Sequence, residues 1–290
     1  MTAFQQAYWL HAPEHPQNVT ALPINSTTIQ INWVVPTVTN GIVRYYIVVY
    51  RIDSNTDLME LNSTNTTALV TGLTPFTFYT LHVLAVTVAR GEASENVTVQ
   101  TNEAAPSAPL DITAFNVSST SINVTWQPPM IPNGIVRSYR VVYTTGSTAA
   151  DVTTTNTSVV IAMLEIFTTY QVQVFATTVA EGDGSNIVMV TTDEDTPGPP
   201  GDLFVNEINS TAIVVTWEEP GITNGIITLY EILYSVGNVT TVSDNDNSVI
   251  VGITTNTSYR HVIGGLDPYT MYTVVIRTYT RIGAGDLTVF

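Results

Sequence analysis

A tryptophan recurs at nearly equal intervals along this chain: Trp33, Trp126 and Trp217 lie 93 and 91 residues apart. An Asn-Gly pair and a tyrosine keep the same two intervals. The Asn-Gly pairs begin at Asn40, Asn133 and Asn224, and the tyrosines are Tyr46, Tyr139 and Tyr230. Several landmarks that hold one period are the signature of tandem structural repeats. The 290 residues therefore predict three modules of about 90 residues each.

Within each repeat the apolar residues alternate as they do in β-strands. The segment 29–33 is apolar at every second residue, and 122–126 repeats that pattern. Such alternation places one face in a core and the other toward solvent. Asn-Gly pairs and prolines punctuate these segments. About seven short strands per repeat predict an all-β fold of antiparallel sandwiches.

A leucine and a tyrosine six residues apart mark a second part of each repeat: Leu73 and Tyr79, Leu164 and Tyr170, Leu266 and Tyr272. The whole pattern is Trp, then Asn-Gly-Ile, Tyr-x-Val-x-Tyr and Leu-x-Pro-x-Thr-x-Tyr. From about residue 13 to the end of the chain it resembles the fibronectin type III family. Module two departs from it at one place, with Ile166 where the other modules carry Pro75 and Pro268.

The resemblance implies three tandem immunoglobulin-like sandwiches in an elongated row. It also implies that each tryptophan packs between two sheets and that Tyr79, Tyr170 and Tyr272 are corner tyrosines, whose hydroxyls fix the loop behind them. Below the family level, the Asn-Gly-Ile and Tyr variants are similar to repeats of receptor tyrosine phosphatase and neural adhesion ectodomains.

The repeats and the proline-containing junctions between them set the expected boundaries. We expect an N-terminal flank over 1–12 and modules over 13–102, 103–194 and 195–290. Module three has 32 residues between Tyr234 and Leu266, compared with 23 and 21 in the others, so its central segment should form a longer hairpin. Because proline stiffens a linker, the row should bend little.

The composition excludes several classes of function. Eight Arg and no Lys face 24 acidic residues, and a formal charge of −16 disfavours nucleic acid and anionic membrane surfaces. A P-loop and a Schiff-base enzyme both need a lysine. The absence of cysteine excludes disulfides, thiolate nucleophiles and Cys-based zinc sites. No apolar run approaches the roughly 20 residues of a membrane-spanning helix.

The polar candidates do not converge on a catalytic or metal site. The histidines, His11, His15, His82 and His261, lack metal-pair spacing. Acidic clusters at 193–195 and at Asp244 and Asp246 lack the ligand spacing of an EF-hand loop, so solvated loop charge is favoured over calcium. The triplet 90–92, Arg-Gly-Glu, resembles an integrin-binding Arg-Gly-Asp. The favoured interpretation of Gly91, and of Gly182 in module two, is a tight hairpin that needs a positive φ. We therefore predict no catalytic, cofactor-binding or metal residue, and no cofactor.

Asn-x-Ser/Thr triplets, the acceptors of N-linked glycans, are abundant and favour a secreted or cell-surface origin. The eleven acceptors are Asn18, Asn25, Asn62, Asn65, Asn96, Asn116, Asn123, Asn156, Asn209, Asn238 and Asn256.

In module one, two strands carry apolar residues on the face that alternation turns toward solvent. This outward set is Tyr45, Ile47, Val49, His82, Leu84 and Val86. Contiguous exposed apolar area usually marks a contact, so we predict a partner patch there. The alternative is that β-branched residues merely suit strands. Asn96 lies nearby, and a sugar on it would cover the edge.

Together these observations predict a non-catalytic extracellular segment that binds or spaces protein partners in a receptor, adhesion or matrix protein. A homophilic contact is possible, and direct membrane insertion of this segment is not expected. The opening residues lack the basic start and apolar stretch of a signal peptide, so an extracellular chain would be a fragment of a longer protein. The alternatives are an accessory array of a secreted bacterial carbohydrate-active enzyme and an intracellular muscle-type array.

Overall fold

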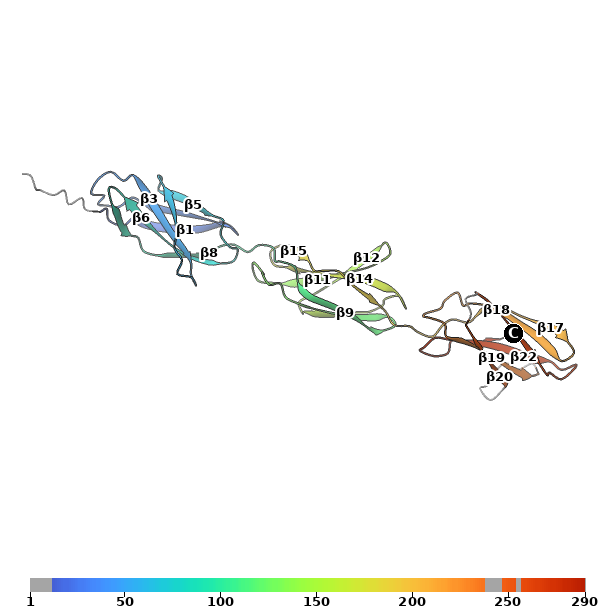
Figure 1. Ribbon diagram of the computed structural model, residues 1–290. Helices are drawn as coiled ribbons and strands as arrows, with labels where there is room; N and C mark the ends of the chain where they lie inside the picture. Colours follow the sequence, from blue (N-terminus) through green and yellow to red (C-terminus); the bar gives the residue numbers. More distant parts are fainter. Residues whose placement is uncertain (1–11, 238–246, 254–256, 290) are drawn as a thin grey trace, which may run out of the picture.

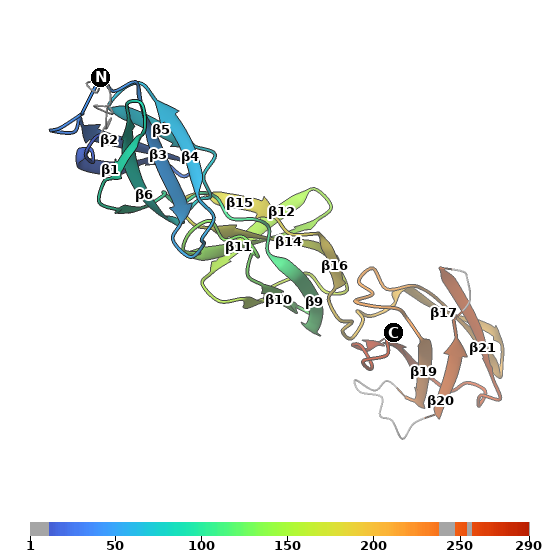
Figure 2. The ribbon, with the colours of Figure 1, turned by 60° about the vertical axis from the view of Figure 1, so that its left-hand side comes forward.

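The computed structural model describes residues 12–237, 247–253 and 257–289. Figures 1 and 2 show three β-sandwiches that follow one another in an elongated row. Every named element of the described residues is a β-strand. The predicted all-β fold class is therefore confirmed. Among these residues, no helix is long and apolar enough to cross a membrane.

Module one contains a three-stranded sheet and a five-stranded sheet, called here the small sheet and the large sheet. The small sheet has the order β1-β2-β5, and the large sheet has the order β4-β3-β6-β7 with β8 also paired to β6. The strands are β1 (Gln17–Asn25), β2 (Thr28–Val34), β3 (Tyr45–Ile52), β4 (Met59–Ser63), β5 (Thr67–Thr71), β6 (Phe78–Val86), β7 (Arg90–Ala93) and β8 (Val97–Gln100).

Module two repeats this topology strand for strand. Its small sheet is β9-β10-β13, and its large sheet is β12-β11-β14-β15 with β16 on β14. The strands are β9 (Leu110–Ser118), β10 (Ser121–Gln127), β11 (Ser138–Thr145), β12 (Thr148–Thr154), β13 (Ser158–Ile161), β14 (Thr169–Thr177), β15 (Glu181–Gly184) and β16 (Val188–Thr191).

Module three has the small sheet β17-β18-β21 and the large sheet β20-β19-β22-β23. The strands are β17 (Gly201–Asn209), β18 (Ala212–Glu218), β19 (Leu229–Val236), β20 (Asn247–Gly252), β21 (Ser258–Gly264), β22 (Tyr272–Tyr279) and β23 (Thr288–Val289). The strands β19 and β20 pair as a hairpin in the stretched segment. Two parts of that segment, 238–246 and 254–256, lie outside the described residues, and with them Asn238, Asp244, Asp246 and Asn256.

The tryptophans occupy the centres of the three cores, as the pattern predicts. Trp33, Trp126 and Trp217 are 4%, 3% and 1% exposed. Each packs edge-on against the tyrosine that keeps its interval, with ring centroids 5.2, 5.4 and 5.5 Å apart. Edge-to-face packing is a favoured arrangement of aromatic rings. The indole and the phenol ring therefore join the small sheet to the large one in every module.

The corner tyrosines also act as predicted. The hydroxyls of Tyr79, Tyr170 and Tyr272 each accept a hydrogen bond, 2.9 Å long, from the backbone N–H five residues before them. In module two the turn has the same form without proline. Phe167 is in the left-handed region at φ 48°, as Phe76 is at 49°, and the Thr168 hydroxyl donates to the Ile166 carbonyl. Ile166 therefore replaces proline without a change in the loop.

Candidate interaction surfaces

The predicted patch of module one is a real cluster, but its centre is not exposed. Ile47, Val49 and Val86 pack together on the outer face of the large sheet, with Tyr45 and Leu84 against them. The first three are 1%, 4% and 6% exposed. His82 is half-buried on the same face. The exposure from which the patch was predicted is therefore wrong, although the residues do meet.

An ion pair covers this cluster. Arg90 donates two hydrogen bonds to the Glu60 carboxylate, at 2.9 and 2.8 Å. Glu60 lies on β4 and Arg90 on β7, with β3 and β6 between them. To meet, the two side chains must lie across both central strands. The methylene groups of long charged side chains can cover apolar surface while their heads stay in water. The pair thus shields the apolar face of module one.

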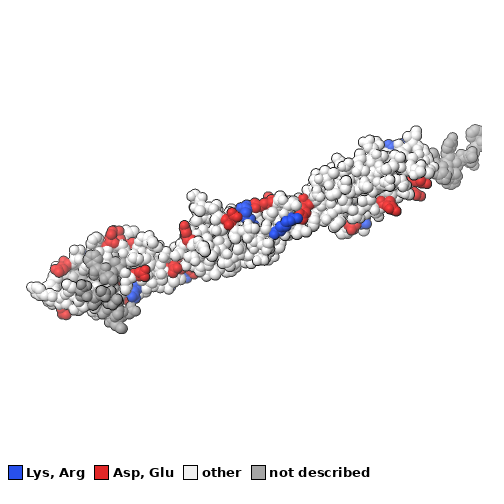
Figure 3. Space-filling model, turned by 180° about the vertical axis from the view of Figure 1, so that it is seen from behind, with Lys and Arg blue, Asp and Glu red and all other residues white. Residues whose placement is uncertain are grey.

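The other modules also place an Arg–Glu pair on this face. In module two Arg140 on β11 reaches Glu181 on β15, at 2.8 and 2.7 Å, and its guanidinium lies 4.8 Å from the ring centre of Phe175. In module three Arg277 lies 3.7 Å from Glu231. Seen from behind, the arginines of the middle module lie beside acidic residues (Figure 3). The few cations of the chain are therefore largely engaged within it.

The junction between modules one and two is held by a carboxylate that sequence reasoning missed. Glu103 accepts a hydrogen bond from the Ile135 N–H at 2.9 Å and pairs with Arg137 at 2.8 Å. These two contacts, the backbone bond first, lower the pKa of Glu103. The Glu103 side chain lies against Gly134, where an added Cβ would come within 2.9 Å of it. The residue before this linker carboxylate, Asn102, bonds through its N–H to Asn25 of module one.

The second junction has the same design. Glu194 lies against Gly225, where a Cβ would come within 2.7 Å, and Arg281 approaches both Glu194 and Asp193. Asp195 bonds module two through Ser119, at 2.8 Å, and module three through the Asn224 carbonyl, at 2.8 Å. The acidic run 193–195 therefore fastens a junction. A signal existed in the sequence, since both glutamates stand 31 residues before the glycine of an Asn-Gly pair.

The asparagine of each Asn-Gly pair also binds the segment that enters its module. The side-chain amides of Asn40, Asn133 and Asn224 donate to carbonyls 28 residues earlier, at 2.9, 2.8 and 2.8 Å. Their φ angles are 48°, 51° and 50°, a region in which asparagine is one of the few tolerated side chains. This landmark is thus a clamp on the incoming chain.

Gly91 and Gly182 lie on β7 and β15 and do not need a positive φ, contrary to our expectation. Neither Gly91 nor Gly182 has a positive φ. Instead an added Cβ would lie 2.4 Å from the Pro13 carbonyl oxygen and 2.1 Å from that of Pro106. In the Arg-Gly-Glu triplet, Arg90 is held by Glu60, and Glu92 lies 3.9 Å from His15. The triplet is therefore packed against its own module.

The remaining polar groups form no metal cluster within the described residues. Burial lowers the pKa of His82, and its hydrogen bond with Asn96 opposes the shift. His15 lies near Gln17, His261 is on β21, and His11 is outside the described ranges. No two of the described histidines are brought together.

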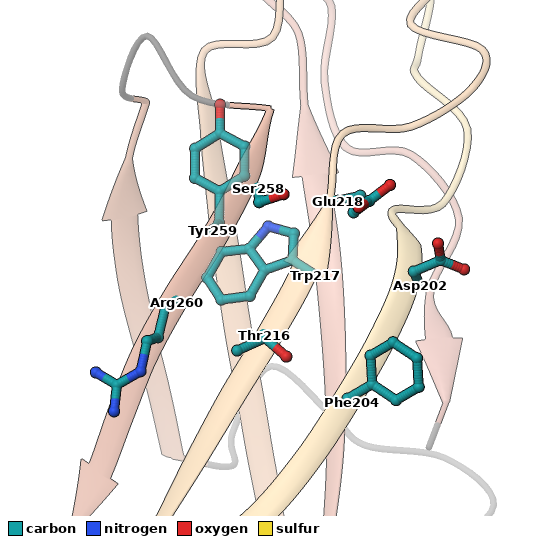
Figure 4. Close-up of a pocket in the computed structure, with 8 residues that line it drawn as sticks. All are labelled: Asp202, Phe204, Thr216, Trp217, Glu218, Ser258, Tyr259 and Arg260. Atoms are coloured by element: carbon teal, nitrogen blue, oxygen red, sulfur yellow. The ribbon is translucent and has the colours of Figure 1, made fainter.

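Module three contains two surface hollows. A shallow depression of about 290 Å³ lies beside β17, β18 and β21 and is lined by Asp202, Phe204, Thr216, Trp217, Glu218, Ser258, Tyr259 and Arg260. Figure 4 shows these side chains. A groove of about 720 Å³ lies between β17 and β22. In modules one and two, Val99 and Val190 fill the corresponding place and join the cores. The groove thus coincides with the place that a valine of the last strand fills in the other two modules.

The glycan acceptors lie on the outside of the row. Of the nine within the described residues, eight are exposed and Asn123 is half-buried. Asn25 and Asn209 end β1 and β17, and their side-chain oxygens accept from the N–H groups of Thr27 and Thr211 in the turns that follow.

Comparison with known proteins agrees with the fold. The model of the fibronectin type III domain matches residues 14–100, 107–191 and 198–289. Receptor-type tyrosine-protein phosphatase F of zebrafish is 31% identical over 95% of this chain, and mouse cell adhesion molecule DSCAML1 is 33% identical over 76%. The chain spans only 12–14% of the length of such relatives. The crystal structure of the chicken CNTN1 FN1-FN3 domains, 21% identical, covers 96% of this chain and 97% of its own with a TM-score of 0.49.

The phosphatase resemblance therefore concerns repeats of this kind, and a phosphatase catalytic domain is not in this chain. The matched repeats account for most of the sequence in three consecutive segments, in step with the tryptophan period. The chain belongs to the fibronectin type III domain family.

Proposed function

We propose that this chain is a non-catalytic extracellular segment that spaces and presents protein-binding surfaces in a receptor, adhesion or matrix protein. The observation that carries the proposal is the repeated design of the junctions. The linker carboxylates, Glu103 and Glu194, each bind residues of the next module. The modules therefore form a row of fixed geometry and do not reorient freely about flexible linkers. A stiff row is what a spacer between surfaces requires.

The relatives support this assignment. Their names describe a receptor-type phosphatase and a cell adhesion molecule. The similarity to each of them covers most of the length of this chain. A protein partner, including a second copy of the chain, fits a surface on which most of the arginines are already paired with carboxylates of the chain. The net charge of −16 opposes nucleic acid as a partner.

The contact face that we propose is the outer face of the large sheet in module one. Tyr45, His82 and Leu84 are half-buried there, above the covered Ile47, Val49 and Val86. Tyrosine and arginine are enriched where interfaces gain most of their free energy, and Arg90 borders this face. The acceptors Asn62 and Asn96 also border it, so sugars there would limit the area open to a partner.

Binding can be tested with the segment secreted from cultured animal cells and coupled to beads. The beads would be mixed with one another, to detect a second copy as partner, and with animal cells, to detect a different one. We expect beads to bind in at least one of these mixtures. Leu84→Glu should abolish binding, whereas Leu69→Glu, on the exposed outer face of the small sheet of the same module, should leave it unchanged. Equal loss with both variants would contradict the proposed face, and no binding at all would contradict a contact role.

The extracellular location has a separate test. Protein from its native source should lose mass after treatment with an N-glycosidase, because the exposed acceptors would carry sugars in a secretory compartment. An unchanged mass would contradict the proposed location and favour an intracellular array.

A further inference from the structure

The outer face of the small sheet in module two has an acceptor asparagine at its centre. Ile122 and Val124, the neighbours of Asn123 on β10, are 0% exposed, so alternation turns Asn123 outward. Asn123 lies directly opposite Phe115 of β9 on one side and Val160 of β13 on the other. Residues opposite one another in an antiparallel pair share a face and have Cβ atoms about 5 Å apart. The three side chains therefore form one row across the sheet.

The flanks of this row are apolar and open. Phe115 and Val160 are 51% and 58% exposed, and Val117, two residues along β9, is 55% exposed. Within the described part of the chain, the Asn123 carboxamide has no hydrogen-bond partner, although it is half-buried. Thr125, the threonine of the Asn123 acceptor triplet, lies on the same face. Its hydroxyl shares a hydrogen bond of 2.7 Å with the hydroxyl of Thr113. The asparagine thus stands between two uncovered apolar side chains with no polar contact of its own.

The matching rows of the other modules differ in the central residue. In module one Gln30 lies between Leu22 and Leu69, which are 59% and 55% exposed, and its amide donates to Asn32. In module three Val214 is the central residue. Only in module two, within these described rows, is an acceptor combined with an aromatic flank. Module two has two further acceptors, Asn116 and Asn156, and both are exposed. Asn156 lies between β12 and β13, away from this row, and serves as the comparison.

We propose that Asn123 carries an N-linked glycan whose first N-acetylglucosamine packs on Phe115 and Val160. One face of that sugar ring presents C–H groups, which suit the face of an aromatic ring with its negative charge density. Because the sugar is bonded to Asn123, the central residue of the row, it lies next to both Phe115 and Val160. Packing would remove apolar surface of the sugar and of both side chains from contact with water, and this burial favours the packed state. The small-sheet face of module two is then a sugar-covered surface, and the partner contact is left to other faces.

This inference rests on the proposed extracellular function, so the first measurement separates the two. The segment secreted from animal cells that make only oligomannose glycans would be digested, and peptides that carry each acceptor would be analysed by mass spectrometry. We expect Asn123 to be occupied. Sugar at other acceptors but none at Asn123 would overturn this inference alone. Sugar at no acceptor would overturn both.

The second measurement tests the packing. After an endoglycosidase trims each glycan to one N-acetylglucosamine, nuclear magnetic resonance of ¹³C-labelled sugar reports the ring current of Phe115. The sugar signals lost in Asn123→Gln should lie upfield of those lost in the control Asn156→Gln. Phe115→Leu should return them to the position of the control signals, and because Phe115 is half exposed the variant should fold. Asn123 signals that coincide with the control signals in the unchanged protein would overturn the proposed contact.

Discussion

The corner tyrosine of each module ties a loop to the sandwich through a single hydrogen bond. In module two the Tyr170 hydroxyl accepts from the Glu165 N–H, and the ring is 4% exposed. A donor left without a partner in such a place costs about 1–3 kcal/mol. Tyr170→Phe should therefore lower the free energy of unfolding by about that amount, measured by urea denaturation.

Tyr143→Phe is the matched control for this substitution. Tyr143 packs edge-on against Tyr170, with ring centroids 6.2 Å apart, and is half-buried. The phenylalanine keeps that ring contact and breaks no loop. A loss with Tyr143→Phe as large as the loss with Tyr170→Phe would show that the hydroxyl of the corner tyrosine has no special role.

A glycine of β15 supports a second prediction at this scale. Gly182→Ala would bring a Cβ to 2.1 Å from the Pro106 carbonyl oxygen, which is backbone and cannot swing aside. Overpacking of this kind costs about 1–3 kcal/mol of stability. Gly221→Ala meets nothing within 4 Å and should be nearly neutral. Thermal unfolding of both variants checks this, and equal midpoints would contradict it.

These residues show what a repeat pattern can and cannot predict. The burial of Trp126 and the bond to Tyr170 were implied by the resemblance to the fibronectin type III family, which the spacing of these residues carries. The reason for Gly182 did not follow. A glycine that permits close approach and one that permits a positive φ are the same letter in a sequence, and only the position of Pro106 distinguishes them.

At the scale of elements, the large sheet of module one shows why alternation misjudged exposure. Alternation correctly places Ile47 on the outer face of β3. It says nothing of Glu60 and Arg90, whose strands border β3 and β6 and whose side chains meet above them. Burial on an outer face depends on long side chains from other strands, so it requires the strand order as well as the period.

The covered face makes a prediction about substitutions. Ile47 is 1% exposed, so Ile47→Asp would bury an unpaired carboxylate and should unfold module one rather than merely remove a contact. Breaking the exposed ion pair with Glu60→Gln should cost less than about 1 kcal/mol. Urea denaturation of the two variants compares these costs. Equal, small effects would show that the pair does not cover the cluster.

At the scale of the whole molecule, the junctions determine what the row can do. Glu103 and Glu194 lie before the first strand of the module in which each is seated, so the orientation of one module is transmitted to the next through a carboxylate and a glycine. The prolines suggested stiffness in the sequence. The contacts that provide it could not be predicted, because they join residues about 30 positions apart whose proximity depends on the finished sandwich.

Glu103 gives this stiffness a predictable dependence on pH. The Ile135 N–H and Arg137 lower the pKa of Glu103 in the seated state, so a proton binds more readily when the junction is released. The state in which Glu103 keeps these two contacts is therefore fully favoured at pH values at and above the ordinary pKa of glutamate. It weakens as the pH falls through the lowered pKa. Module one and module two should thus keep a narrow range of relative orientations at neutral pH and a broader one in acid.

The chain has no cysteine, so two can be introduced to carry spin labels, at the exposed Thr67 of module one and the exposed Thr153 of module two. Pulsed electron resonance would then give the distribution of distances across the junction. We expect a narrow distribution at pH 7 that broadens in acid and in Glu103→Ala, whereas Glu95→Ala, an exposed glutamate of module one, should leave it narrow. Glu103→Gln should show no further broadening as the pH falls, because the titrating group is gone. A wide distribution of distances in the unchanged chain at pH 7 would mean that Glu103 does not fix the orientation of module two relative to module one. That result would also contradict the proposed role as a spacer of fixed geometry.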